Sequence, residues 1–170
     1  MGYEKVIGLV GYKNSGKTTF SEKLISFGSS NGLKIGTIKH HGHGGPPHLE
    51  SAKTDSSKQF EAGAVVSAVE GDGTLSLQAY SDHWSLYDIL KFYESFSLDF
   101  IVIEGYKNEN IPKILFIRTH KDLNLLESVS NIVAVVSWIP IDESEVHCFF
   151  IEDDSTIIKW VFSFLGFDLA

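Results

Sequence analysis

Several short apolar runs along the chain have the length and composition of buried β-strands. They are rich in valine, isoleucine and phenylalanine, and most are apolar at consecutive rather than alternate positions. Continuous apolar runs of this length are typical of parallel strands that are covered on both faces of a sheet. The runs cover residues 5–10, 33–39, 99–104, 113–118 and 132–137, with a weaker case at 147–151.

Other segments carry apolar residues at the three- and four-residue spacing of an amphipathic helix. In the first of them Phe20, Leu24 and Phe27 repeat at this spacing. Asp82 precedes the third segment and is its predicted N-cap. The helical segments are residues 18–30, 55–62, 84–96 and 154–165.

The order of these elements predicts the fold class. Gly71-Asp72-Gly73 separates two strand-like runs, residues 64–69 and 74–80, and predicts a β-hairpin. Elsewhere strands alternate with helices, which indicates an α/β fold with a mostly parallel, mixed sheet between two helical layers. The chain has 170 residues, so we expect one domain over residues 1–170.

The composition argues against two classes of partner. The chain has 14 Lys and Arg against 22 Asp and Glu, a net charge of −8, so neither nucleic acid nor an anionic membrane is an expected main partner. No apolar stretch approaches the ~20 residues needed to span a membrane.

Cys148 is the only cysteine, which excludes an internal disulfide and fits a reducing compartment. We therefore expect a soluble, cytoplasmic protein.

Residues 11–18, Gly-Tyr-Lys-Asn-Ser-Gly-Lys-Thr, match the phosphate-binding pattern G-x-x-x-x-G-K-[ST] between a predicted strand and a predicted helix. Glycines let such a loop curl its backbone N–H groups inward, and the helix that follows directs its positive end to the same point. Lys17 would reach the β- and γ-phosphates and the Thr18 hydroxyl would ligate Mg²⁺. This predicts a P-loop NTPase fold with three α/β/α layers. The predicted nucleotide-binding residues here are Gly11, Lys13, Asn14, Ser15, Gly16, Lys17, Thr18 and Thr19.

A magnesium nucleotide also needs an acidic residue at the carboxyl end of a neighbouring strand. Asp99 and Glu104 bracket one strand and lie roughly 16 Å apart at ~3.3 Å per residue, so only one can reach the phosphates. Ligands bind at the carboxyl ends of parallel strands, which selects Glu104 as a metal-binding and catalytic acid. Lys39 ends the strand over residues 33–39 and Lys107 lies three residues after Glu104, so both are predicted nucleotide contacts.

Two further features have alternative interpretations. Asp55 is either a catalytic acid that lies near the metal or positions water, or a plain helix cap. Residues 40–54 hold four histidines, including His40, His41 and His43, and form either a ligand-contacting loop or a transition-metal site. Residues 52–55 and 119–122 only partly match the guanine-reading pattern N/T-K-x-D, so we credit neither as a base reader.

The motifs together resemble those of the molybdopterin-guanine dinucleotide biosynthesis protein B family. The resemblance rests on G-Y-K-N-S-G-K-T-T, I-K-H-H-G-H, T-D-S, A-G-A, D-F-I-V-I-E-G-Y-K and P-K-I, which occur in this order between residues 6 and 118. It implies a dimeric, weakly hydrolysing GTP-binding adapter. The partner would be the guanylyltransferase that attaches GMP to molybdopterin, with molybdopterin as a further candidate ligand. It also places Lys17 and Thr18 at the phosphates and Mg²⁺, Glu104 in the Walker B role and Asp55 in the family's D-S element.

Two other functions remain open at this point. One is a small-molecule P-loop kinase, which usually closes an arginine-bearing lid over the donor phosphates. Arg118 is the only arginine and is predicted on a strand, so a lid with several arginines is excluded and a kinase is disfavoured. The same placement makes Arg118 a poor arginine finger, so we expect slow hydrolysis. A GTPase metallochaperone would use the histidine loop to load metal.

The C-terminal helix predicts an assembly. Its apolar residues cover well over half of its circumference, more than one core-facing stripe needs. The excess face is covered either by the same chain or by a second copy. We expect a homodimer that uses this helix or the edge of the Gly71 hairpin.

Overall fold

The structure is a computed structural model that describes residues 5–42, 55–141 and 146–169. Its described residues form two compact units. The larger unit contains residues 5–42 and the described residues from position 90 onward, and the smaller unit contains residues 55–89. The expectation of a single domain over residues 1–170 stays a prediction, since compactness alone does not decide whether each unit folds independently.

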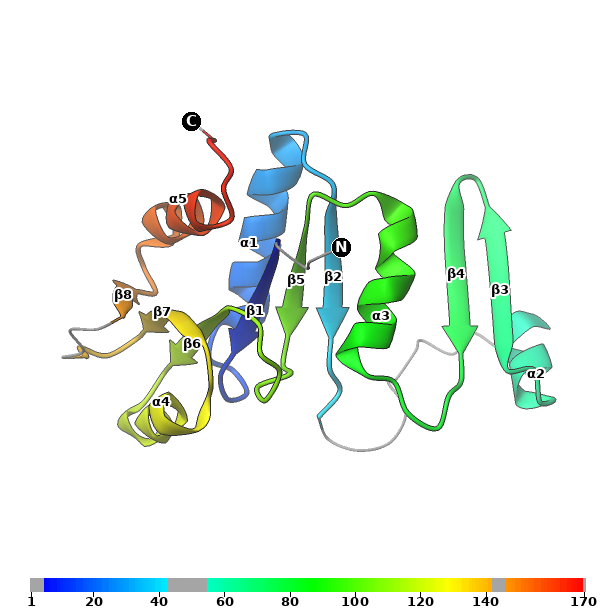
Figure 1. The fold of residues 1–170 in the computed structure, drawn as a ribbon, viewed down its shortest axis with the longest axis horizontal. Helices are drawn as coiled ribbons and strands as arrows, with labels where there is room; N and C mark the ends of the chain where they lie inside the picture. Colours follow the sequence, from blue (N-terminus) through cyan, green and yellow to red (C-terminus); the bar gives the residue numbers. More distant parts are fainter. Residues whose placement is uncertain (1–4, 43–54, 142–145, 170) are drawn as a thin grey trace. The chain divides into compact units, whose positions relative to one another are not determined.

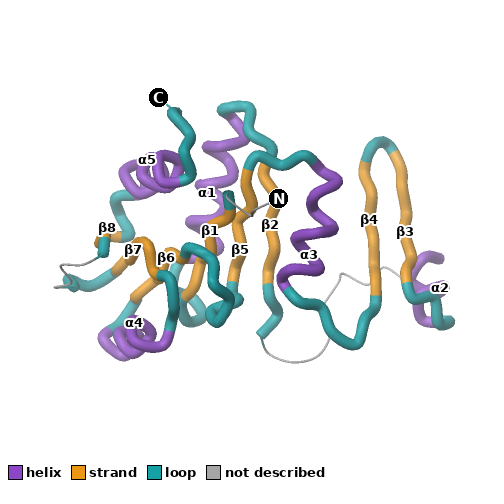
Figure 2. The backbone as a smooth tube through the Cα atoms, viewed as in Figure 1, coloured by secondary structure: helices purple, strands orange, loops and turns teal. Residues whose placement is uncertain are grey.

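The larger unit is built on a parallel sheet, whose described strands follow the order β2-β5-β1-β6-β7-β8 (Figures 1 and 2). Every run predicted as one of these strands is present, within two residues at each end. Because the strands are parallel, their carboxyl ends share one edge, with β1 between β5 and β6. The strands are β1 (Val6–Val10), β2 (Ile35–Lys39), β5 (Phe100–Glu104), β6 (Lys113–Ile117), β7 (Ile132–Ser137) and β8 (His147–Phe150).

Strand side chains alternate between two apolar cores, one on each face of the sheet. On β6, Ile114 and Phe116 belong to the core beneath α1 and α5, whereas Leu115 and Ile117 belong to the core beneath α4. Helices thus cover both faces, and the predicted three-layer α/β/α class is confirmed. These helices are α1 (Lys17–Ser30), α4 (Asn124–Ser128) and α5 (Asp154–Phe164).

The smaller unit contains the predicted hairpin. Its strands β3 (Val66–Gly71) and β4 (Thr74–Ala79) pair antiparallel with each other, beside α2 (Asp55–Glu61). The hairpin is a sheet of its own, so the expectation of one mixed sheet is corrected: the antiparallel pairing is local and the described strands of the larger sheet are all parallel.

The helix predicted over residues 84–96 begins later and with another cap. It consists of α3 (Leu86–Tyr93) followed by the 3₁₀ turn η1 (Glu94–Phe96). Ser85 and Asp88 form a reciprocal cap, in which the Asp88 backbone N–H donates to the Ser85 hydroxyl and the Ser85 N–H donates to the Asp88 carboxylate. Asp82, the predicted cap, instead accepts a hydrogen bond from the Tyr80 hydroxyl.

The C-terminal helix α5 is covered largely by its own chain. Ile157, Ile158, Val161 and Phe162 are buried in the core beneath α1 and α5. Trp160 packs instead against His147, Phe149 and Phe164.

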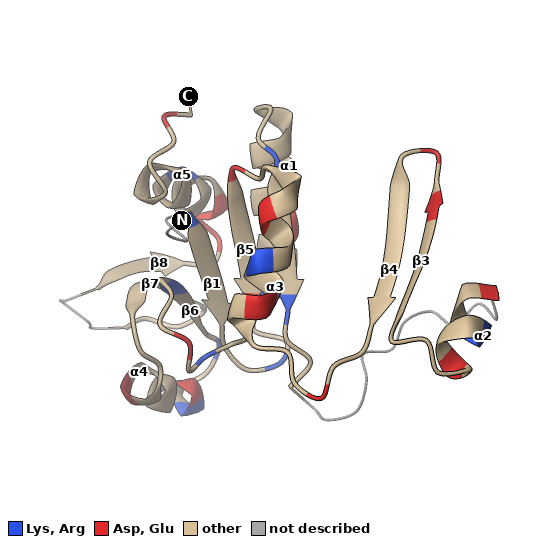
Figure 3. Cartoon of the chain, turned by 45° about the vertical axis from the view of Figure 1, so that its right-hand side comes forward, with Lys and Arg blue, Asp and Glu red and all other residues tan. Residues whose placement is uncertain are grey.

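Acidic and basic residues are interspersed along the elements of both units (Figure 3). Within the described residues no helix is long and apolar enough to cross a membrane.

Candidate functional site

The loop between β1 and α1, residues 11–18, is called the glycine loop here. Gly11 and Gly16 have φ angles of +156° and +98°, and a Cβ atom at Gly11 would lie 2.7 Å from the Phe116 carbonyl oxygen. α1 begins at Lys17 without a side-chain cap and without an acidic residue in its first turn. The first N–H groups of a helix have no intrahelical acceptor, so this loop presents donors and the positive helix end together.

Lys17 lies across the glycine loop. Its ammonium donates hydrogen bonds to the Tyr12 carbonyl at 2.7 Å and to the Ser15 hydroxyl at 3.1 Å. Partial burial lowers the pKa of Lys17, the negative charge of Glu104 opposes this shift, and the positive charge of Lys39 adds to it. Lys17 is therefore a positioned cation that an anion in the loop would stabilise.

Glu104 ends β5 beside the glycine loop, as predicted. Its Oε2 atom pairs with Lys39 Nζ, at the end of β2, at 3.0 Å, and its side chain is only 14% exposed against 67% for Lys39. Asp99 lies at the opposite end of β5, where its carboxylate accepts the Lys34 backbone N–H at 2.6 Å. The carboxylate of Glu104 and the hydroxyl of Thr18 are hard oxygen donors of the kind that Mg²⁺ prefers, so the residues at this edge fit that ion.

Two motifs that are distant in sequence meet beside Glu104. The His40 backbone N–H donates to the Glu104 carbonyl at 2.9 Å, and the His40 ring lies 4.7 Å from the Tyr106 ring. A Cβ atom on Gly105, whose φ is +87°, would approach the His40 Cβ to 3.0 Å. Tyr106 also has a positive φ of +51°, a conformation that costs energy for such a residue. I-K-H and E-G-Y-K thus form one packed corner of the site.

The opposite side of the glycine loop carries Arg118, whose predicted position on a strand was wrong, and Trp138, for which there was no prediction. Arg118 was predicted on a strand, but β6 ends at Ile117 and the Arg118 guanidinium donates to the Asn14 carbonyl at 2.5 Å. Trp138 follows β7, and its indole N–H donates to the Ser15 carbonyl at 3.1 Å. Lys39 and Lys107 were predicted as lysines at or near strand ends, and extending that rule to an arginine or tryptophan directly after a strand would have found both.

Asp122 has a structural role near Arg118. Its carboxylate accepts the backbone N–H groups of Arg118 and Thr119 and the Thr119 hydroxyl, and so caps the 3₁₀ turn η2 (His120–Leu123). Burial by itself would raise the pKa of Asp122, but these hydrogen bonds hold it below its ordinary value. The partial base-reading match at residues 119–122 is therefore a helix cap.

The remaining predicted site residues lie as follows. Lys13, Asn14, Thr18 and Thr19 are exposed in the glycine loop and the first turn of α1, whereas Ser15 is buried. Lys107 lies in the exposed turn after Tyr106. Asp55 belongs to the smaller unit, where it begins α2 and pairs with Lys58 at 2.9 Å. Its role at a metal stays a prediction.

The histidine loop is described only in part. His40 and His41 are described, whereas His43 lies outside the described residues. Within the described part of the chain, no group of three or more His, Cys, Asp or Glu side chains is arranged to hold a metal ion. The role of this loop stays open.

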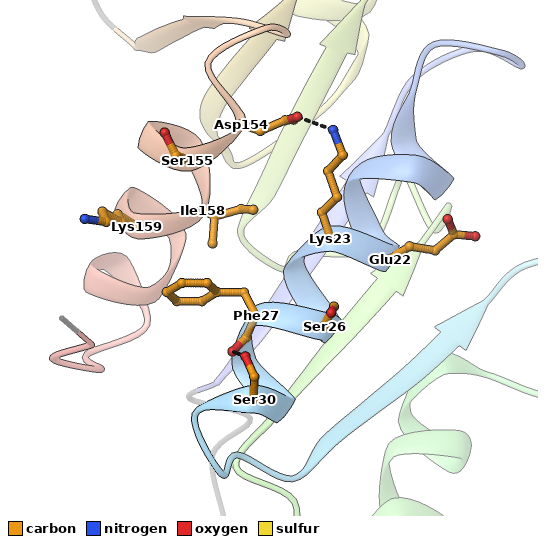
Figure 4. A pocket seen from close by; sticks show the side chains of 9 residues that line it. All are labelled: Glu22, Lys23, Ser26, Phe27, Ser30, Asp154, Ser155, Ile158 and Lys159. Atoms are coloured by element: carbon orange, nitrogen blue, oxygen red, sulfur yellow. Dashed lines mark hydrogen bonds and ion pairs between the residues drawn. The ribbon is translucent and has the colours of Figure 1, made fainter.

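An open pocket of about 630 Å³ lies between α1 and α5 (Figure 4). Phe27 and Ile158 form its apolar wall, and Lys23 pairs with Asp154 on its rim. The lining residues of α1 start at Glu22, beyond the first turn of the helix, so the pocket is separate from the glycine loop.

A parallel sheet with a glycine loop between its first strand and first helix defines a P-loop NTPase-like α/β protein. The chain matches the profile of the family MobB, "Molybdopterin guanine dinucleotide synthesis protein B", over residues 6–138, and it belongs to this family. The match extends past residue 118, where the motifs recognised in the sequence end.

Individual relatives agree with this assignment. A Bacillus subtilis protein named "Probable molybdopterin-guanine dinucleotide biosynthesis adapter protein" is 39% identical over 131 residues, which are 77% of this chain and 75% of the relative. The crystal structure of Bacillus subtilis MobB has a TM-score of 0.83 at 33% identity and covers 94% of this chain and 97% of that one. A MobB homologue from Bacillus stearothermophilus has a TM-score of 0.79 at 35% identity, over 95% and 97%.

Proposed function

We propose that this protein is a nucleotide-dependent adapter in molybdopterin guanine dinucleotide biosynthesis and that it binds GTP with Mg²⁺ at the glycine loop. The observation that carries the proposal is the uncapped start of α1, with the Lys17 ammonium held over the same loop. The adapter role and the choice of guanine are supported by the family and by the names of the relatives.

In this proposal the two sides of the glycine loop have different tasks. The N–H groups of the loop and of the first turn of α1 bind the phosphates, with Lys17 as their counter-charge. Thr18 and Glu104 hold Mg²⁺, which neutralises phosphate charge when bound. Lys39, now paired with Glu104, gives up that carboxylate to the ion and is then free to contact a phosphate oxygen.

Slow hydrolysis is part of the proposal. An arginine finger is worth ~10³–10⁵ in rate. Arg118 follows β6 and Glu104 ends β5. These strands flank β1, so the two residues lie two strand spacings, ~10 Å, apart. The Arg118 guanidinium is moreover held by the Asn14 carbonyl. Single-turnover assays of the isolated protein should give below about one turnover per second, and a faster rate would contradict this assignment.

The proposed partners follow from the family. They are a molybdenum cofactor guanylyltransferase, with molybdopterin as a further ligand, and a second copy of this chain. For the second copy the hairpin offers the better surface: Val66, Leu75 and Leu77 lie on one face of it and are each about half exposed. The apolar residues of α5 are mostly used within the chain.

Nucleotide titration tests the proposal. GTP and ATP are titrated with and without Mg²⁺ into the parent protein, into Lys17→Ala and into Lys34→Ala, an exposed lysine remote from the loop. We expect tight Mg²⁺-dependent GTP binding that Lys17→Ala abolishes and Lys34→Ala preserves, with folding unchanged by circular dichroism. Equal GTP binding by Lys17→Ala and the parent would refute the assignment of the loop.

Adding a molybdopterin-bound guanylyltransferase tests the adapter role. We expect the parent protein, but not Lys17→Ala, to increase the formation of the guanine dinucleotide when GTP is limiting. An increase of the same size with Lys17→Ala would separate the adapter role from nucleotide binding.

A further inference from the structure

An aromatic side chain lies directly against the glycine loop without serving as core. Trp138 is 47% exposed although its indole N–H donates to the Ser15 carbonyl at 3.1 Å. A Cβ atom on Gly16 would lie 3.7 Å from the Cζ2 and Nε1 atoms of Trp138, an ordinary van der Waals distance, so the indole lies against the loop backbone. A large aromatic ring that is fixed at one edge and open to solvent elsewhere is available for a ligand.

Arg118 fixes this indole from a second direction. Its guanidinium carbon lies 5.4 Å from the centre of the Trp138 ring, and its Nη1 atom donates to the Asn14 carbonyl at 2.5 Å. Trp138 and Arg118 are thus both bound to carbonyl groups of neighbouring loop residues, Ser15 and Asn14. The ring is held in place before any ligand binds, which reduces the entropy that binding would cost.

The carboxyl edge of the sheet carries different kinds of side chain on the two sides of β1. On the β5 and β2 side of β1 it carries the charged pair Glu104 and Lys39, and on the β6 and β7 side it carries Arg118 and the Trp138 indole. A nucleotide is divided in the same way, into a metal-binding polyphosphate and a flat, aromatic base. With the phosphates in the loop, β7 lies two strand spacings, ~10 Å, from β1, within reach of the nucleoside.

We propose that Trp138 forms the nucleoside subsite of the nucleotide site, with the solvent-exposed part of its indole packing against a purine ring; this rests on the nucleotide binding proposed above. Every base has a π-face, so stacking on an aromatic side chain adds affinity without reading the base, by about tenfold or more. The subsite therefore accounts for binding of the purine and leaves the choice between guanine and adenine to other groups.

Comparison of a nucleotide with its phosphates alone tests this inference. MgGTP and magnesium tripolyphosphate are titrated calorimetrically into the parent, Trp138→Ala and Trp138→Phe. We expect Trp138→Ala to weaken GTP binding about tenfold or more while leaving tripolyphosphate binding unchanged. Trp138→Phe keeps an aromatic ring but loses the hydrogen bond to Ser15, so it should retain most of the GTP affinity.

Three outcomes would overturn the inference. If Trp138→Ala weakens both ligands equally, Trp138 supports the loop and does not touch the nucleoside. If it weakens neither, the base lies elsewhere. If the parent protein binds neither ligand, both the proposed nucleotide function and the subsite are refuted. If the parent binds both ligands, either of the first two outcomes refutes the subsite alone.

Tryptophan fluorescence provides an independent readout. The chain has three tryptophans, so Trp84→Phe with Trp160→Phe leaves Trp138 as the sole indole, and Trp84→Phe with Trp138→Phe leaves Trp160 as a matched control. GTP should change the emission of the Trp138 protein and tripolyphosphate should not, with the Trp160 protein correcting for absorption by the nucleotide. An identical response of both proteins to GTP would contradict stacking on Trp138.

Discussion

Lys17 and Glu104 act on each other across the glycine loop before any ligand is present. Burial lowers the pKa of Lys17 and the carboxylate of Glu104 counteracts that shift, while Glu104 is itself neutralised by Lys39 at 3.0 Å. Two cations and one carboxylate at the end of β1, β2 and β5 leave a local excess of positive charge. In a chain with a net charge of −8, this local arrangement is what would favour a polyanion.

The lowered pKa of Lys17 predicts a proton uptake. As pH rises, Lys17 loses its proton earlier than an ordinary lysine does, because burial disfavours the ammonium form. A bound polyphosphate stabilises that form and raises the pKa again, so at alkaline pH binding should take up a proton. Calorimetry in two buffers of different ionisation enthalpy measures this uptake. The uptake should grow as pH rises through the alkaline range, and an uptake that does not change with pH would assign it to another group.

The two acids of β5 should differ in their effect on magnesium. Glu104→Gln should reduce the Mg²⁺-dependent part of nucleotide affinity at least about tenfold, since even residues that only orient a ligand cost about 10–100-fold in metal affinity. Asp99→Asn should leave it intact, because Asp99 binds the Lys34 N–H at the other end of the strand. Equal effects of the two substitutions in Mg²⁺ titrations would show that the metal is not at the Glu104 edge.

At the scale of the elements, a buried lysine at the start of β6 forms hydrogen bonds to the loops beside it. Lys113 is fully buried, and its ammonium donates to the carbonyl groups of Glu109, Ile111 and Ser130. Burial lowers its pKa, and the nearby Glu109 opposes this. These hydrogen bonds tie the segment before β6 to the loop before β7, at the end of β6 opposite to Arg118.

Lys113→Met tests these hydrogen bonds. Methionine fills a similar volume but leaves the carbonyl groups of Ile111 and Ser130 without this donor, whereas the Glu109 carbonyl keeps the Ile111 N–H. An unsatisfied polar group costs about 1–3 kcal/mol. We expect urea unfolding to show a loss of about 2 kcal/mol or more in the free energy of unfolding. Lys91→Met, at an exposed position of α3, is the control and should change little. A loss as small as that of the control would mean that water replaces the ammonium.

At the scale of the whole molecule, one face of the β3–β4 hairpin is not covered by the rest of its unit. Ser67 is buried and its hydroxyl donates to the Ser56 carbonyl of α2, so one face of the hairpin is packed. Val66, Leu75 and Leu77 point to the other face and remain about half exposed. Glu70, opposite Leu75, lies at the end of the same face. An exposed face that is mostly apolar is typical of a contact between subunits.

Sedimentation tests the dimer and its contact. The parent protein should sediment at twice the chain mass at micromolar concentration, and Leu75→Lys with Leu77→Lys should shift it to the monomer, because charges would be buried in the contact. Val69→Lys, an exposed position on the opposite face, is the matched control and should stay dimeric. A parent protein that sediments as a monomer with and without GTP would refute the dimer. A dimeric double variant would place the contact elsewhere.

The sequence by itself determined the strands, the main helices, the hairpin and the family. It also placed Glu104 at the same edge as the glycine loop and Asp99 at the other. These inferences succeed because side-chain periodicity is local, and because parallel strands must end at a common edge. The helix after β6 was missed, since α4 has only five residues and follows a 3₁₀ turn.

Only the tertiary structure decided which distant side chains contact the glycine loop. Arg118 and Asn14 lie 104 positions apart in sequence and Trp138 and Ser15 lie 123 apart, yet each pair is joined by a hydrogen bond. Lys113 looks like a surface lysine in sequence and is fully buried. The apolar excess of α5 likewise meets β8 through Trp160 and Phe149. The physical reason is that burial and hydrogen bonding depend on which segments pack together, and no pattern along one segment contains that information.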